Sequence, residues 1–218
     1  MFRNIEIMLI LLLAGGVFAA SPQPVGGLTI VNATGRGTGA LTTVIDGKAL
    51  QGCAESPGQV GPNLMLPVGT RRIQFSRDGL APLSIKLRME RAITQQVVVY
   101  AEWREASHSW CLAAHVLEKF GEDGGPRLQL LSCMSRGRVD LALGDASGVW
   151  RAVSLERLAP LRLPLELERG YLPLRTATRE LPAMPVIPGA YHHLVFYDDV
   201  RGMIHCVSLR QRPWLTGS

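Results

Sequence analysis

The chain repeats itself weakly at a spacing of about 100 residues, and this repeat restricts its fold more than any other feature. Four short apolar runs of the first half recur in the same order in the second half. The first set is 28–32 (LTIVN), 43–47 (TVIDG), 68–75 (VGTRRIQF) and 95–101 (QQVVVYA), and its counterparts are 128–132 (LQLLS), 140–145 (DLALGD), 168–175 (ERGYLPLR) and 192–198 (HHLVFYD). Four elements matched in order favour one duplicated domain over a chance likeness between short strands.

The runs are rich in Val, Ile, Leu and Tyr and are separated by Gly, Pro, Asp and Asn, which is typical of short strands joined by tight turns. Asp46-Gly47 lies between two such runs, where a hairpin needs residues that tolerate positive φ. The sequence therefore predicts an all-β protein with two tandem β-sandwich domains, a first repeat at 26–102 and a second at 127–212.

Hydrophobic alternation indicates which faces of the strands are covered. Apolar and polar residues alternate over 84–89 and over 138–143, which predicts one covered and one exposed face, with Lys86 and Arg88 on the exposed side. Residues 97–100 are apolar at consecutive positions. That pattern predicts a strand covered on both faces, or one whose outer face meets a neighbouring domain. We expect Tyr100 and Tyr197 to be ordinary core residues.

Residues 103–126 separate the two repeats and are interpreted as a linker. Its centre, 107–120, could form a short helix with Ser107 as N-cap and Gly121 as the stop.

At the amino terminus, residues 1–20 resemble a secretory signal peptide, with an apolar stretch too short to span a bilayer and small residues before Ser21. The alternative is an uncleaved membrane anchor. A signal peptide predicts a periplasmic or extracellular protein.

That location decides how the cysteines are interpreted. Four cysteines in an oxidising compartment can form two bridges in three ways, and none lies in a CxxC pair. Cys133 and Cys206 lie at opposite ends of the second repeat, so we predict one disulfide between them. A second is predicted between Cys53 and Cys111.

Charge and motifs leave little support for catalysis. The net charge of +5 rests almost wholly on arginine, which suggests a polyanionic neighbour, although a plain solvated charge balance explains it equally well. Nucleic acid is disfavoured by the signal peptide and by the dispersal of the basic residues.

His192 and His193 would face opposite sides of one strand, and His108 and His115 lack a metal-ligand spacing. No GxSxG motif is present. We therefore expect no catalytic, metal or cofactor-binding residues, and no enzyme.

Taken together, the order of elements resembles a known family. A signal peptide, a sandwich opening with LTIVN, a connector carrying 116–120 (VLEKF), a second sandwich opening with LQLLS and two final strands resemble the periplasmic AlgF family of alginate biosynthesis proteins. The resemblance covers nearly the whole mature chain but rests on order and length. The four cysteines and the high arginine content depart from it.

The resemblance implies a non-catalytic periplasmic adaptor in exopolysaccharide O-acetylation, bridging the membrane and periplasmic proteins of an alginate-like acetylation complex. The alternative is a secreted carbohydrate-binding or cell-surface structural β-sandwich module, which would bind glycan without acyltransferase partners. An esterase or transferase would require a Ser-His-Asp cluster that the linear sequence does not display.

Overall fold

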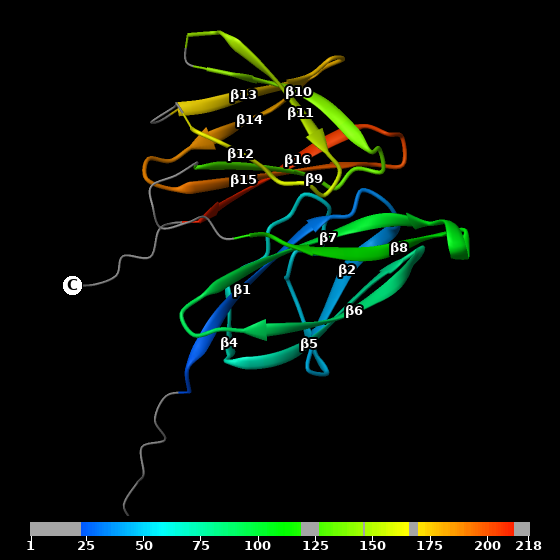
Figure 1. Ribbon diagram of the computed structural model, residues 1–218. Coiled ribbons are helices and arrows are strands. Elements are labelled where there is room, and N and C mark those ends of the chain that lie inside the picture. The colour runs from blue at the N-terminus through cyan, green and yellow to red at the C-terminus, as the bar shows by residue number, and fades with distance from the viewer. Residues whose placement is uncertain (1–22, 119–126, 146, 166–169, 212–218) are drawn as a thin grey trace, which may run out of the picture.

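The computed structural model describes residues 23–118, 127–145, 147–165 and 170–211, and these are built almost entirely from β-strands (Figure 1). The all-β class predicted from sequence is confirmed. The helical content of the described ranges is one 3-10 turn, η1 (Glu105–Ser107). Within those ranges no helix is long and apolar enough to cross a membrane. The predicted signal peptide, 1–20, lies outside the described residues.

Each half contributes eight of the described strands. In the first half these are β1 (Val25–Ala33), β2 (Thr38–Ile45), β3 (Lys48–Leu50), β4 (Leu64–Pro67), β5 (Gly69–Asp78), β6 (Leu80–Met89), β7 (Thr94–Arg104) and β8 (Ser109–Val116). In the second half they are β9 (Leu128–Ser132), β10 (Arg138–Gly144), β11 (Trp150–Glu156), β12 (Leu161–Leu163), β13 (Gly170–Thr176), β14 (Glu180–Val186), β15 (Tyr191–Asp198) and β16 (Ile204–Gln211).

The strands of the two halves pair in the same order. In the first half β1 pairs with β4 and, in parallel, with β7, which pairs with β8; in the second, β9 pairs with β12 and, in parallel, with β15, which pairs with β16. The other sheets run β3-β2-β5-β6 and β11-β10-β13-β14. One difference is a parallel contact, Ala81 with Cys111, which joins the two layers of the first half into one eight-stranded sheet. The shared order is what a duplication predicts; common descent of the halves stays a prediction.

Backbone conformation at the turns follows the sequence. Asp46 and Gly47 have φ of 48° and 83°, so the predicted hairpin between β2 and β3 is confirmed. Gly69 and Gly170, the first residues of β5 and β13, have φ of 122° and 111°. Side-chain-bearing residues rarely adopt these values, so glycine allows each strand to leave its preceding bend.

The strands stack in four layers (Figure 1). Three apolar clusters lie between these layers. One cluster fills the first half and includes Ile30, Phe75 and Leu112. Another fills the second half and includes Leu141 and Phe196. A third lies between the halves, where β1, β7 and β8 face β9, β15 and β16. Two inner sheets are therefore buried on both faces, and two outer sheets have one face in solvent.

The third cluster explains the consecutive apolar run at 97–100. Val97 and Val99 pack into the core of the first half, whereas Val98 and Tyr100 pack between the halves. The expectation that this strand is covered on both faces is confirmed. Tyr197 of β15 packs between the halves as well, so both tyrosines are buried core residues as predicted.

The interpretation of 103–126 as a linker with a short helix is wrong for its described part. Trp103 and Arg104 end β7, and β8 runs antiparallel to it through a turn at His108. Trp110, Leu112 and Ala114 pack into the core of the first half, every second residue, as a strand requires. The first half therefore extends to β8. Residues 119–126 lie outside the described part of the chain.

The two predicted disulfides are absent, since all four cysteines are free thiols. Cys133 belongs to the cluster between the halves, whereas Cys206 packs against the core of the second half. Cys53 lies in the core of the first half, while Cys111 shares the opposite face of β8 with Ala113. Each predicted pair is thus divided by a sheet. Position along the sequence gave no information about the face on which each cysteine lies.

Candidate functional site

Asp198 forms a polar junction between the two halves. It ends β15 of the second half, and its side chain is 5% exposed. Arg36, in the turn after β1, donates to Asp198 Oδ2 at 3.2 Å and stacks on Trp110 with 3.8 Å between its guanidinium carbon and the ring centroid. From the second half, Ser135 donates its main-chain N–H to Oδ1 at 2.8 Å and its hydroxyl to Oδ2. This carboxylate holds the two halves together.

The histidines do not complete a catalytic arrangement at this junction. His205 pairs with Asp199 at 3.1 Å and stacks on Tyr197, and this hydrogen bond lowers the pKa of Asp199. Ser135 is held directly by Asp198, which is itself neutralised by Arg36. A serine nucleophile needs a base that is free to take its proton. Asp198, bound by a guanidinium, is poorly suited to that role.

The other predicted histidine positions are scattered. His192 and His193 are buried on opposite faces of β15, as expected, and His115 lies on β8. Burial lowers the pKa of all three, and that of His193 to about 4, so each favours its neutral form. Among the described residues no group of three or more His, Cys, Asp or Glu side chains is placed to hold a metal ion.

A second polar contact spans the halves at Glu102 of β7. Arg157, from the second half, pairs with Glu102 at 2.8 Å and donates from Nε to the carbonyl of Met134 at 2.9 Å. Its guanidinium also lies 5.7 Å from the centroid of the Tyr100 ring. Burial, with a smaller effect of Glu102, raises the pKa of Tyr100 to about 12. These contacts fix the orientation of the halves.

The outer sheet of the first half carries a basic face, which we define as Arg72 of β5 with Lys86 and Arg88 of β6. Arg72 and Lys86 lie directly opposite each other in the antiparallel register, and Arg88 is the next outward residue along β6. All three are exposed. Like charges in opposed positions repel and destabilise a sheet. A stable fold gains nothing from this pairing, so it suggests a binding role.

Among the described residues, the side chains of Arg72, Lys86 and Arg88 form no ion pair with a carboxylate. The outward residues next to the cluster, Thr70, Gln74, Ser76 and Ser84, are uncharged, and the exposed carboxylate of Asp78 lies at the other end of β5. Arg72 donates from Nε to Ser84 at 3.3 Å. Asp46 lies near but accepts from the main-chain N–H of Arg72 at 2.9 Å and from Arg71 at 3.1 Å. These bonds, that of the Arg72 N–H first, lower the pKa of Asp46. The three cations are left without an ion-pair partner.

A shallow hollow of about 310 Å³ adjoins the basic face. It is lined by Val44, Gln74, Phe75, Ser76, Pro82, Leu83 and Ser84. Hydroxyl and amide groups therefore lie beside exposed cations on one flat sheet. Such a surface offers hydrogen bonds to the hydroxyl groups of a sugar and charge to a carboxylate on the same ring.

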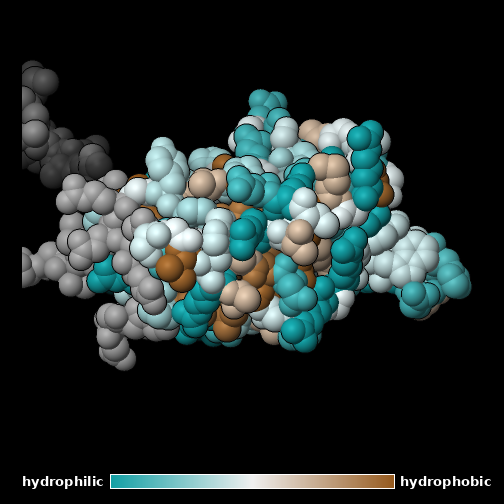
Figure 2. Space-filling view, turned by 90° about the horizontal axis from the view of Figure 1, so that it is seen from above, coloured by the Kyte–Doolittle hydropathy of each residue, from teal (hydrophilic) through white to brown (hydrophobic). Residues whose placement is uncertain are grey.

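The outer sheet of the second half differs. Seen from above, its surface mixes hydrophilic and apolar side chains (Figure 2). Its outward charges have both signs: Arg138 pairs with Asp140 at 3.4 Å, and Arg175 stacks on Trp150 at 4.0 Å. The unneutralised cation cluster is thus a property of the first half.

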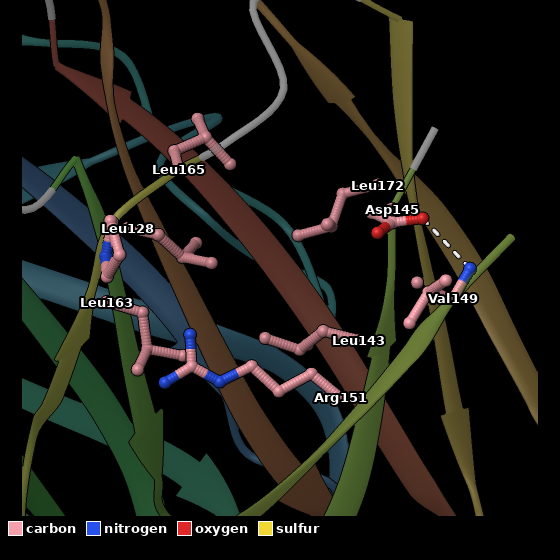
Figure 3. Close-up of a pocket in the computed structure, with 10 residues that line it drawn as sticks. Leu128, Leu143, Asp145, Val149, Arg151, Leu163, Leu165 and Leu172 are labelled. Carbon is pink, nitrogen blue, oxygen red and sulfur yellow. Dashed lines mark hydrogen bonds between the residues drawn. The ribbon is translucent and has the colours of Figure 1, made fainter. Parts of the chain in front are cut away.

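An apolar pocket opens at one end of the second half, between β10, β11, β12 and β13 (Figure 3). Leucines from several of these elements line it, together with Asp145 and Arg151. No motif in the sequence indicated this pocket. Arg151 shares the inward side of β11 with Val153 and Leu155, and this break in the apolar alternation was the available indication.

The sequence predicted part of the basic face, because Lys86 and Arg88 were expected on the exposed side of 84–89, and this is confirmed. The opposition of Arg72 and Lys86 depends on register between two strands and was missed.

Comparison with known proteins adds no assignment: no protein-family model matches the chain, and no curated protein matches it.

Proposed function

We propose that this protein is an exported, non-catalytic adaptor that holds the partners of an O-acetylation complex close to an anionic, alginate-like exopolysaccharide. The observation that carries the proposal is the unpaired basic face, in which Arg72 opposes Lys86 with Arg88 beside them. A polyanion that binds there reduces the repulsion between these cations, so binding removes an interaction that destabilises the sheet.

The hollow beside the basic face supports a sugar polymer in preference to a simple anion. Gln74, Ser76 and Ser84 line it, and these groups hydrogen-bond hydroxyls in either direction. A uronate ring carries hydroxyls and a carboxylate together, and a flat strand surface accommodates an extended chain. The O-acetylation partners are proposed from the resemblance to the AlgF family.

An adaptor role is consistent with the junction between the halves. The groups that could act in acyl transfer, Ser135 and Asp198, are engaged with each other and with Arg36. The junction thus supports the relative orientation of two outer faces, one of which can bind polymer while the other remains available to a protein partner.

The first experiment measures binding of the purified protein to immobilised alginate, with neutral dextran as the comparison polymer. Lys86→Glu should weaken alginate binding by about tenfold at low ionic strength, because one attraction becomes a repulsion. Binding of the wild type should fall as salt rises. Arg138→Glu, which makes the same charge change on the exposed outer face of the second half, is the matched control and should bind as the wild type does.

Equal loss in both variants would indicate an effect of net charge alone, and unchanged binding by Lys86→Glu would remove the basic face from the proposal.

Polymer-bound acetate in a deletion strain then separates the adaptor from a plain carbohydrate-binding module. We expect the strain to make polymer with reduced acetate, restored by the wild type and not by Lys86→Glu. Normal acetylation in the deletion strain would favour the module.

A further inference from the structure

The pocket of the second half is small and mostly apolar. It has a volume of about 160 Å³ and is lined by Leu128, Leu143, Gly144, Asp145, Val149, Arg151, Leu163, Pro164, Leu165 and Leu172. Figure 3 shows leucine side chains directed into it from both sides. An apolar protein cavity of about 150 Å³ holds a molecule the size of benzene. The pocket thus has room for a group of about six carbon atoms.

Arg151 places a cation at this apolar site. It lies on β11 directly opposite Leu143 of β10, on the inward side that Val153 and Leu155 also occupy. Its side chain extends across the pocket toward the side that Leu163 lines (Figure 3). Within the described part of the chain, no hydrogen-bond or ion-pair partner reaches its guanidinium. Arg151 is an exposed residue, so its guanidinium is solvated and available to pair with an anion whose apolar part lies among the leucines.

Asp145 lines the same pocket but is occupied by its own turn. Its Oδ1 accepts the main-chain N–H of Ser147 at 2.9 Å, the Ser147 hydroxyl at 2.7 Å and the N–H of Val149 at 2.9 Å. These bonds, that of the Ser147 hydroxyl first, lower the pKa of Asp145 and keep it ionised. It lies beyond ion-pair distance of Arg151. Its role is to shape the rim between β10 and β11.

We propose that this pocket binds a small carboxylate with an aliphatic tail of about six carbons. The tail would occupy the leucine-lined space, and the carboxylate would pair with the guanidinium of Arg151, whose planar fork matches two carboxylate oxygens. The site lies in the second half, apart from the basic face, and does not depend on the proposed function.

The test titrates hexanoate into the purified protein at pH 7 and follows the methyl resonances of its leucines by NMR. Hexan-1-ol keeps the tail without the charge, acetate keeps the charge without the tail, and hexylammonium reverses the charge. Hexanoate should perturb the leucines that line the pocket and bind about tenfold more tightly than each of the other three.

Arg151→Gln should reduce hexanoate affinity to about that of hexan-1-ol. Arg175→Gln is the matched control, since it removes the same charge from the outward face of the same sheet and should leave the affinity unchanged. Leu172→Phe fills the pocket without touching the charge and should abolish binding of hexanoate and hexan-1-ol alike. If hexanoate fails to bind at millimolar concentration, or binds no better than hexan-1-ol or equally to Arg151→Gln, the proposal is wrong.

Discussion

At the scale of single residues, the junction at Asp198 shows how one side chain joins the two halves. Its carboxylate is held from one half by Arg36 and from the other by Ser135. The backbones also approach closely there, because a Cβ on Gly35 would lie only 2.2 Å from the carbonyl oxygen of Asp198. The absence of a side chain at Gly35 therefore allows the ion pair to form.

Replacing Asp198 should lower the stability of the protein more than replacing an exposed aspartate. Asp198→Ala leaves Arg36 and Ser135 without their acceptor, and we expect a loss of about 2–3 kcal/mol in the free energy of unfolding. Urea unfolding followed by tryptophan fluorescence measures this. Asp140→Ala, at a fully exposed position on β10, is the control and should change the midpoint little. Similar losses in both variants would contradict a special role for the junction.

The cysteines should be unreactive in the native protein. Burial raises the pKa of Cys133 and of Cys206 to about 12, and it also raises that of Cys53. The thiolate is the reactive form, so at pH 8 we expect labelling by a thiol reagent on the order of a hundredfold slower than in denaturant. Four thiols should be counted after unfolding without reductant. A count of two or none would show that disulfides form in the protein.

At the scale of elements, sequence pattern predicted strands best where burial is one-sided or complete. The alternation over 138–143 placed Val139, Leu141 and Leu143 inward, and all three lie in the core. Sequence pattern gave the wrong element at 107–120, because the apolar residues there fit two periods. Trp110, Ala114 and Leu117 fit a helix, whereas Trp110, Leu112 and Ala114 fit a strand. Pairing with β7 decided between the two. A single segment does not contain that information.

The candidate sites show the same limit. Exposure of Lys86 followed from local alternation, but its opposition to Arg72 follows from the register of β5 and β6, which the sequence does not state. The pocket arises where the strands of two sheets end together, so it depends on how the layers are stacked. In the sequence Arg151 only interrupts a hydrophobic pattern. Its position at the pocket follows from its pairing with Leu143 across the two strands.

The basic face should reduce the stability of the element that carries it. Lys86→Glu turns the repulsion from Arg72 into attraction, so we expect the free energy of unfolding to rise by about 0.5 kcal/mol at low salt. Lys86→Gln should give a smaller gain, and high salt should reduce both. Chemical unfolding at two ionic strengths measures these differences. A Lys86→Glu protein less stable than the wild type at low salt would contradict a net repulsion between these cations.

At the scale of the whole molecule, the halves meet through corresponding faces. Val98 and Tyr100 of β7 and Val195 and Tyr197 of β15 all belong to the cluster between them. A closed two-fold dimer buries the same patch of both subunits in this way. Here one chain supplies both patches, so the outer sheets point away from each other. The basic face and the outer sheet of the second half are thereby held at fixed positions on opposite sides of the molecule.

The interface between the halves should make the stability of the whole protein depend on pH. His193 faces it from β15 and is 1% exposed. Burial first, with smaller effects of Arg162 and His192, lowers its pKa from 6.5 to about 4, against a side-chain hydrogen bond with Gln211 that raises it. The unfolded chain therefore binds this proton more readily. Stability is complete above pH 6.5 and decreases as pH falls from 6.5 toward 4.

We expect the wild type to lose about 2 kcal/mol through His193 between pH 7 and pH 5, with further loss in the same direction from His115 and His192. Urea unfolding across this range measures the slope. His193→Gln cannot gain this proton, so its slope should be clearly shallower even if its stability at pH 7 is lower. His108→Asn, at an exposed turn, should keep the slope of the wild type. Equal slopes in the wild type and His193→Gln would mean that this histidine accepts a proton within the folded interface, and that the two halves move apart enough to solvate it.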